Sequence, residues 1–297
     1  MRIIKGSSVV LDSPVFVASD GETPTDCSST PTCSVTRADG TSLTAAVVSD
    51  ASGNGRYTAA ITTTHTSRVD VLTVVWTGAV SGYTQVYTTE LEVAGGHYAT
   101  IPQLRAEPGL EDPGKVSTAE LREVLSLYED LVEDVTGVAW VRRYARISVG
   151  GFGNSAVLLR RTFPEPAPLP TVIAVTVEGV AQTTADFGVS RDGLLVWNAG
   201  YFPIPGTTYS PYNVTLDLEH GYQSPPPALA REVRKAVRYE LLSRHSDLPS
   251  NQISQTFDGL TIRYSTPDPK NGRPTGILSL DAVLNLPGIM HRIPGIA

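Results

Sequence analysis

The sequence predicts an α+β fold in which a β-rich N-terminal region is followed by two helices with further strands between them. Three observations predict it: short apolar segments up to residue 96, a capped amphipathic helix after residue 116, and a second helix after three consecutive prolines. The chain has 297 residues, of which 41% are hydrophobic and 18% charged. This composition is typical of globular proteins and excludes a disordered acidic polymer.

Residues 1–96 are expected to form short strands separated by turns. The candidate strands are 9–11, 15–18, 33–37, 43–48, 57–62, 69–76 and 84–93. Seven such strands within 96 residues are typical of an immunoglobulin-like antiparallel sandwich. The strand 69–76 is apolar on both faces after Asp70, which indicates a central position in its sheet.

The segment 97–116 contains several prolines and glycines, and we interpret it as a linker or an ordered extended arm. A helix is expected over 117–136, because Ser117 and Glu120 match a capping box and Gly137 can take the left-handed conformation that ends a helix. One face of this helix is apolar and the opposite face is acidic.

Residues 138–222 return to strands, and segments 138–149 and 156–163 are expected to pair as a hairpin. The second helix, 226–245, follows a run of prolines and carries a basic face. The acidic and basic helices could pair within one subunit or between neighbouring subunits. The C-terminal segment 258–297 is expected to form the rest of a short hairpin that begins at residue 254, followed by an arm. The tail of this arm, 276–297, is apolar but irregular, so it is expected not to fold alone and to need a surface that covers it.

Charge and apolar runs exclude further classes of protein. The net charge of −7 argues against a protein that wraps nucleic acid. The apolar runs are too short for a membrane-spanning helix, so no membrane partner is expected, and the N-terminus shows no secretory signal.

No motif in the sequence carries chemistry. Residues 151–156 match the letters GxGxxA, but a strand rather than a helix is expected to follow them. The five histidines are scattered, and Cys27 and Cys33 lack the further ligands of a zinc site. The sequence therefore predicts no catalytic residue, no cofactor and no metal. The two cysteines are expected to be reduced thiols, and a small disulfide loop between them is the alternative.

Several short segments together point to one family. They are 55–59, 68–76, 92–96, 104–106, 135–137, 191–195, 221–227, 275–276 and 280–284. With them the chain resembles the head-to-tail adaptor (connector) proteins of long-tailed bacteriophages, especially those that infect actinobacteria. The Gly-Tyr-x-x-Pro-Pro lead into the second helix is the most specific of these segments.

The resemblance implies a structural virion protein that is not an enzyme, located at the head-tail neck and assembled in the host cytoplasm. It implies a homo-oligomeric ring, usually a dodecamer, beneath the portal protein, with a head-closure or tail-completion protein on its other side. Double-stranded genome DNA would pass through the lumen. It also implies an adaptor domain, 117–257, that combines a helical core with a β insertion, and a C-terminal arm within 258–297 that reaches the portal.

Three sets of residues are assigned to these roles as hypotheses. The portal-docking arm is assigned to Ile277, Leu278, Leu280, Val283, Leu284, Leu286, Ile289 and Ile293. Subunit contacts are assigned to Glu123, Asp130, Glu133, Arg231, Arg234 and Arg238. Acids that would keep the duplex from binding the lumen are Glu120, Glu129 and Asp134. Deleting residues 276–297 is expected to leave a folded protein that no longer joins the portal.

Two other functions stay open at this stage. Another virion or surface module could use the immunoglobulin-like domain to bind a carbohydrate or a host receptor. That function predicts an aromatic platform, for which the available residues are Phe16, Tyr57, Trp76, Tyr83 and Tyr87. A hydrolase of cell-wall polymer would need two converging carboxylates or a metal site, and the sequence offers neither clearly.

Overall fold

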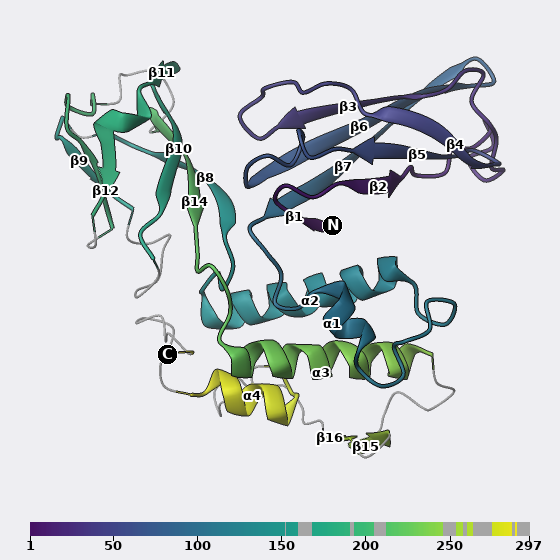
Figure 1. Ribbon diagram of the computed structural model, residues 1–297. Helices are drawn as coiled ribbons and strands as arrows, with labels where there is room; N and C mark the ends of the chain where they lie inside the picture. The colour runs from purple at the N-terminus through teal and green to yellow at the C-terminus, as the bar shows by residue number, and fades with distance from the viewer. Residues whose placement is uncertain are drawn as a thin grey trace. The chain divides into compact units, whose positions relative to one another are not determined.

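The fold is mixed α+β, as expected, with several β-sheets and four α-helices among the described residues (Figure 1). This computed structural model describes residues 1–151, 153–159, 168–190, 193–204, 212–245, 254–257, 260–263, 275–286 and 289. The chain divides into two compact units: Met1–Gly95 with Arg143–Arg146, and Gly96–Arg142 with Ile147–Ala297. None of the described helices is both long and apolar enough to cross a membrane.

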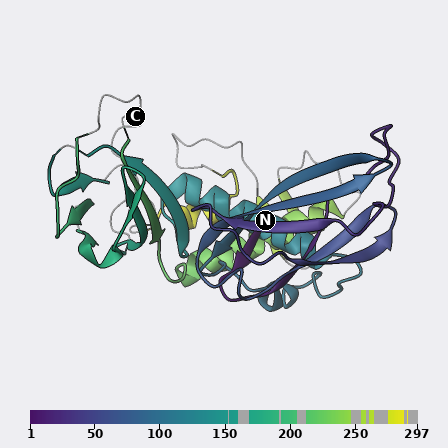
Figure 2. The ribbon, with the colours of Figure 1, turned by 90° about the horizontal axis from the view of Figure 1, so that it is seen from above.

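The first unit consists of two sheets that share one apolar core. One sheet has the order β1-β7-β6-β3, formed by β1 (Arg2–Ile4), β7 (Tyr83–Ala94), β6 (Asp70–Val80) and β3 (Thr32–Arg37). The other has the order β2-β5-β4, formed by β2 (Val9–Asp12), β5 (Arg56–Ile61) and β4 (Val47–Gly53). β1 runs parallel to β7, and the neighbouring β6 and β7 form a long antiparallel hairpin, blue in Figure 2.

Alternation along the strands carries apolar side chains into this core. Leu72, Val74 and Trp76 of β6 are at most 1% exposed, and they alternate with half-buried residues. Phe16 packs edge-on against Tyr57, with ring centroids 5.6 Å apart. At the turn before β5, Gly55 has a φ of +70°, and a Cβ there would lie 2.2 Å from the Phe16 carbonyl oxygen, so this position requires glycine.

Four helices form the apolar core of the second unit. They are α1 (Ile101–Arg105), α2 (Thr118–Thr136), α3 (Pro227–Arg244) and α4 (Leu278–Leu284). The predicted start of α2 is confirmed, since Ser117 Oγ accepts from the Glu120 N–H and the Glu120 carboxylate accepts from the Ser117 N–H. The predicted end is also confirmed, with Gly137 at a φ of +65°. Because α2 and α3 share this core, the acidic and basic helices pair within one subunit.

The prediction of a linker over 97–116 is wrong, because this stretch is part of the helical core. This stretch contains α1, which begins with its own capping box between Thr100 and Gln103. It also places Leu104 and Leu110 in the helical core at 0% exposure. The prolines and glycines therefore mark turns on either side of buried leucines rather than a loose connection.

Seven described strands between α2 and α3 form two sheets with a core of their own. One has the order β11-β10-β14-β8, from β11 (Val180–Gln182), β10 (Thr171–Val177), β14 (Val214–His220) and β8 (Arg143–Val149). The other has the order β12-β13-β9, from β12 (Phe187–Val189), β13 (Leu194–Trp197) and β9 (Ala156–Leu158). Since β8 and β9 lie in different sheets, the hairpin expected from 138–149 and 156–163 is wrong. After α3, β15 (Ser254–Phe257) and β16 (Leu260–Arg263) form a hairpin.

Candidate functional site

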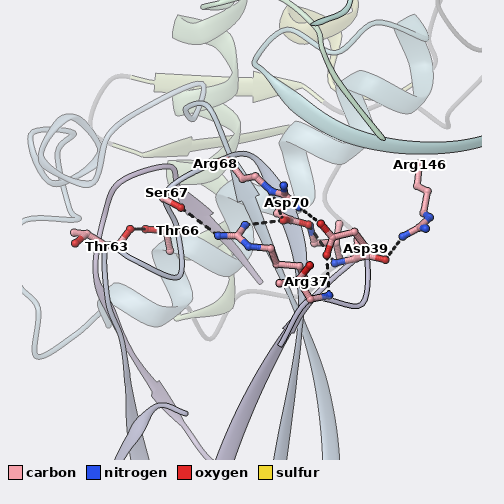
Figure 3. Close-up of polar contacts among 11 residues, drawn as sticks. Arg37, Asp39, Thr63, Thr66, Ser67, Arg68, Asp70 and Arg146 are labelled. Carbon is pink, nitrogen blue, oxygen red and sulfur yellow. Dashed lines mark hydrogen bonds and ion pairs between the residues drawn. The ribbon is translucent and has the colours of Figure 1, made fainter. Parts of the chain in front are cut away.

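A network of charged side chains lies in the first unit where β6 begins (Figure 3). Asp70 is fully buried, and its Oδ2 accepts from Arg37 Nη1 at 2.7 Å and from Arg68 Nε at 2.9 Å. Its Oδ1 accepts from the backbone N–H groups of Ala38 at 3.3 Å and Val71 at 2.9 Å. The two oxygens of Asp70 thus meet four donors, which is how a buried carboxylate avoids the cost of lost hydration.

Asp39 and Ser67 extend this network. Arg68 Nη2 donates to Asp39 Oδ2 at 2.6 Å, and Arg37 Nη2 donates to Ser67 Oγ at 3.1 Å. Partial burial acts to raise the pKa of Asp39, but hydrogen bonds from Thr41 and Arg68 and the charge of Arg68 outweigh it and lower that pKa to about 2. Asp70 and Arg37 are shielded from solvent, so their charges are not available to a ligand. Their hydrogen bonds to Ala38 and Ser67 instead hold together the loops at this end of the sheets.

Two arginines of β8 complete the first unit. Arg146 donates to the carbonyl oxygen of Ala38, beside the network (Figure 3). Arg143 Nη1 lies 3.2 Å from Glu92 Oε1, and the other oxygen of Glu92 accepts from Arg2 Nε at 2.7 Å. Both arginines that flank Glu92 are 5% exposed. These contacts explain why the first four residues of β8 belong to the first unit.

The sequence does contain a signal for this network, in two charged residues at inward-facing strand positions. Asp70 shares the inward face of β6 with Leu72 and Val74, and Arg37 shares the inward face of β3 with Val35. A charge on an otherwise apolar inward face needs an opposite charge close by. The inward positions of Asp70 and Arg37 therefore predict an ion pair between them.

Glu129 does not face a lumen, which corrects its predicted role. It is 0% exposed in the second unit, where His97 Nδ1 lies 3.1 Å from its Oε2 and the Tyr98 N–H donates to its Oε1 at 2.6 Å. The physical reason is its position on α2, four residues after the buried Leu125 and therefore on the same helix face.

The other two predicted lumen acids lie nearer to solvent. Glu120 is 36% exposed, but it closes the capping box with Ser117 and lies 3.3 Å from His245 Nε2. Hydrogen bonds from Ser117 lower the pKa of Glu120. Asp134 is exposed. Of the three acids, Asp134 therefore remains the one suited to a channel wall.

Arg238 is not available to a neighbouring subunit, which corrects its predicted role. It is 4% exposed, and its Nε donates to the Pro108 carbonyl oxygen at 2.5 Å. Four others of the predicted contact set have a partner in the same chain: Glu123 with Arg244 (3.2 Å), Arg234 with Glu107 (3.5 Å), Arg231 with Glu232 (3.2 Å) and Glu133 with the Tyr98 hydroxyl (3.2 Å). Asp130 is exposed on α2.

The C-terminal apolar residues find a covering surface within their own chain. Four of them enter the helical core at no more than 7% exposure: Ile277, Leu280, Leu284 and Ile289. The expectation that this tail cannot fold without a partner is therefore wrong for α4, because α3 supplies the apolar surface. Deleting 276–297 would remove these buried side chains from the helical core, so the stability of the shortened chain has to be measured together with its binding to the portal.

The remaining members of the predicted arm are more accessible. Leu278 is 37% and Leu286 45% exposed, and Val283 is half-buried. Ile293 lies outside the described residues. The docking hypothesis therefore depends on Leu278 and Leu286 within the described part of the tail.

The aromatic platform that a carbohydrate-binding first unit would need is not formed by the five candidate rings. Phe16, Tyr57 and Trp76 are at most 5% exposed. Tyr87 packs against the same core, and Tyr83 is 64% exposed at the β6–β7 turn. Packing between the sheets turned most of these rings inward, which leaves a single exposed ring among the five.

Both cysteines are free thiols in this structure. Burial raises the pKa of the Cys33 thiol to about 11, so it is a poor nucleophile near neutral pH. Within the described ranges, no three His, Cys, Asp or Glu side chains converge as they would at a metal centre.

Comparison with known proteins found no family model that matches the chain and no curated protein with significant similarity to it.

Proposed function

We propose that this protein is a head-to-tail adaptor of a long-tailed bacteriophage. It would form a ring beneath the portal, join the capsid vertex to the tail and let genome DNA pass. One observation carries the proposal: α2 and α3 pack together while seven described strands are inserted between them in the chain. A helical core with a β insertion is the organisation that the sequence resemblance implies.

We further propose that the first unit is an immunoglobulin-like domain added to this adaptor core. Its strand orders β7-β6-β3 and β2-β5-β4 correspond to the G-F-C and B-E-D orders of a constant-type sandwich. The domain lacks the disulfide that joins the sheets of antibody domains, since Cys27 and Cys33 are free. The two sheets are joined instead by the shared apolar core, and the Asp70 network fixes the loops at one end of them.

Charge on α2 supports the passage of DNA. Asp130 and Asp134 stand one helical turn apart on the exposed side of α2, and the whole chain has a net charge of −7. A wall that repels phosphates lets the duplex slide, whereas a basic wall would release counterions and hold it. We assign the lumen to this face of α2, so Asp130 moves from the predicted subunit contacts to the lumen and takes the place of the buried Glu129.

Contact with the portal is assigned to a preformed element. The buried side of α4 lies on α3, while Leu278, its first residue, and Leu286, two residues after its end, are exposed. A docking element that is already folded avoids the entropy cost of ordering on its partner.

Electron microscopy of the purified full-length protein tests this function. We expect rings with a central channel, and a stable complex on size-exclusion chromatography with the portal protein encoded by the same genome. A variant with Asp130→Lys and Asp134→Lys should still form rings, but these rings should retain DNA at low salt. A protein that remains monomeric both alone and with the portal protein would refute the proposal.

A further inference from the structure

One long edge of the first unit, along β7, has no strand beside it in the described part of the chain. β1 pairs only with the last three residues of β7, which leaves the stretch 83–91 open on that side. The Glu92 N–H donates to the Met1 carbonyl oxygen at 2.9 Å, and it therefore points away from β6. Because backbone groups alternate in direction along a strand, every second residue before Glu92 also presents its N–H and C=O groups to the open side. These residues are Thr84, Val86, Thr88 and Glu90.

The other edge strands described in this unit are protected against pairing. β3, at the far edge of the same sheet, is covered by the chain that follows it, since the Leu43 N–H donates to the Val35 carbonyl oxygen at 2.9 Å. β1 and β2 are short, and the register of β4 with β5 shifts between Asp50 and Gly53. Covering, shortness and bulges are the usual ways in which proteins protect an edge. The stretch 83–91 has none of them, and it contains no proline or lysine.

Contacts on the inner face of the sheet hold this edge in place. The Gln85 side chain donates to the Val17 carbonyl oxygen at 2.6 Å and accepts from the Val17 N–H at 3.3 Å. The Tyr87 hydroxyl donates to the Val15 carbonyl oxygen at 3.3 Å, and its ring packs edge-on against Phe16 with centroids 5.3 Å apart. These contacts leave the outward backbone groups free. An edge that is already rigid lowers the entropy cost of binding.

The chemistry of the edge selects another extended backbone, because only a strand can satisfy a row of N–H and C=O groups. A second copy of β7 fits this edge when it runs antiparallel. Thr88 of one copy then lies opposite Val86 of the other, and Glu90 lies opposite Thr84, so the whole open stretch is paired. Residues 83–89 are uncharged, and no like charges meet in this register. A parallel copy in register would place the two Glu90 carboxylates side by side, which is unfavourable.

We propose that β7 of one copy pairs antiparallel with β7 of a second copy, so that two four-stranded sheets join into one continuous sheet. The contact uses the same strand on both sides and is therefore isologous, with two-fold symmetry. It does not rest on the adaptor function, because a ring is closed by a heterologous contact that repeats around its axis. Pairing through β7 instead joins two free chains, or two rings.

A proline at an outward position of β7 tests the contact. Thr88→Pro removes an N–H group that points away from β6, so the bonds between β6 and β7 stay intact. The symmetric contact loses two hydrogen bonds, and pairing should weaken by about 30-fold or more. Mass photometry across a dilution series should find the unchanged protein at twice the mass of this variant, whether single chains or rings are paired. A purification tag belongs at the C-terminus, since residues placed before Met1 would continue β1 along the open edge.

Two further variants separate backbone pairing from other causes. The double variant Val86→Lys with Thr88→Lys changes two exposed side chains and places like charges opposite each other in the paired strands, so it should also halve the mass. It keeps the test decisive if circular dichroism shows that the proline variant is unfolded. Val86→Thr is the matched control, because it removes the apolar side chain at 58% exposure and keeps the backbone and the preference for a strand. This control should pair as the unchanged protein does.

Hydrogen exchange locates the contact. The amides of the four outward residues of β7 should exchange more slowly in the paired protein than in the lysine variant. An unchanged protein with the same mass as the lysine variant, or a paired protein in which these amides are equally fast, would overturn the β7 contact. Rings of single mass would leave the adaptor function in place and refute this contact alone. Pairs of chains without any ring would support this contact and refute the adaptor function.

Discussion

Removing the Asp70 carboxylate should strongly destabilise the first unit. In Asp70→Ala, two guanidinium groups and two backbone N–H groups lose their acceptor. Arg37, 9% exposed, then keeps its charge with the Ser67 hydroxyl at 3.1 Å as a neutral partner. Breaking a buried ion pair from one side costs about 3–5 kcal/mol, and we expect a loss of this size in the free energy of unfolding.

Two comparison variants separate charge from volume. The double variant Arg37→Met with Asp70→Leu removes both charges together, and it should recover most of the loss, since apolar replacement of a whole buried pair is often neutral or stabilising. Asp39→Ala removes a carboxylate that is 22% exposed and pairs with Arg68, itself 30% exposed. A pair as accessible as this contributes only about 0–1 kcal/mol.

Urea unfolding followed by tryptophan fluorescence measures these differences. Trp76 is 1% exposed in the core of the first unit, so changing Trp140 and Trp197 to phenylalanine makes the signal specific to that unit. A lower midpoint at an unchanged m-value reports lost stability. A loss below about 1 kcal/mol in Asp70→Ala, or a double variant as unstable as the single one, would refute the reasoning.

Three further changes test other parts of the structure. The pKa of Asp39 is lowered from its ordinary 3.8 to about 2, so its contribution to stability is present above pH 3.8 and is lost as the pH falls toward 2. Asp39→Asn should flatten the dependence of the unfolding midpoint on pH in that window, and curves of equal slope would contradict it. Leu284→Ala should lower the free energy of unfolding by about 2–5 kcal/mol, because this fully buried side chain joins α4 to the helical core. Its matched control Leu286→Ala, at 45% exposure, should change it little, and equal losses would refute the packing of α4. Burial raises the pKa of Cys33 to about 11, so iodoacetamide at pH 8 should label it only in denaturant. Peptide mass spectrometry reads this labelling, and a modified Cys33 in the native protein would be the contrary result.

Helix ends were predictable from the sequence because their signals are local. The start of α2 depends on hydrogen bonds between Ser117 and Glu120, three residues apart, and its end on Gly137. The side chains that specify these ends lie within one turn of them, so the local amino-acid sequence is sufficient to predict where the helix begins and ends.

Strand partners were not predictable in the same way. Alternation along β8 and β9 identifies them as strands, but β8 lies beside β14 and β9 pairs with β13, both distant in the chain. An alternating pattern fixes which face of a strand is buried and leaves its partner open.

The sequence also did not show which apolar or charged side chains of a helix would be buried. Glu129 was grouped with exposed acids by its charge, although its spacing from Leu121 and Leu125 places it on the buried face of α2. Leu280 and Leu284 were expected to need an outside partner, because the surface of α3 that covers them could not be known before the helices were placed. In both cases the exposure of a side chain was inferred from its chemical type alone, because the residues that pack against it were not known.

The return of β8 to the first unit affects the order in which this protein can fold during synthesis. The seven strands of that unit leave the ribosome first, but Arg143 and Arg146 are translated only after all of α2. Until then, Glu92 has Arg2 as its arginine partner and lacks the second one. A fragment cut at residue 96 would carry the same deficit permanently, so a transplanted copy of this unit needs the four residues of β8 supplied with it.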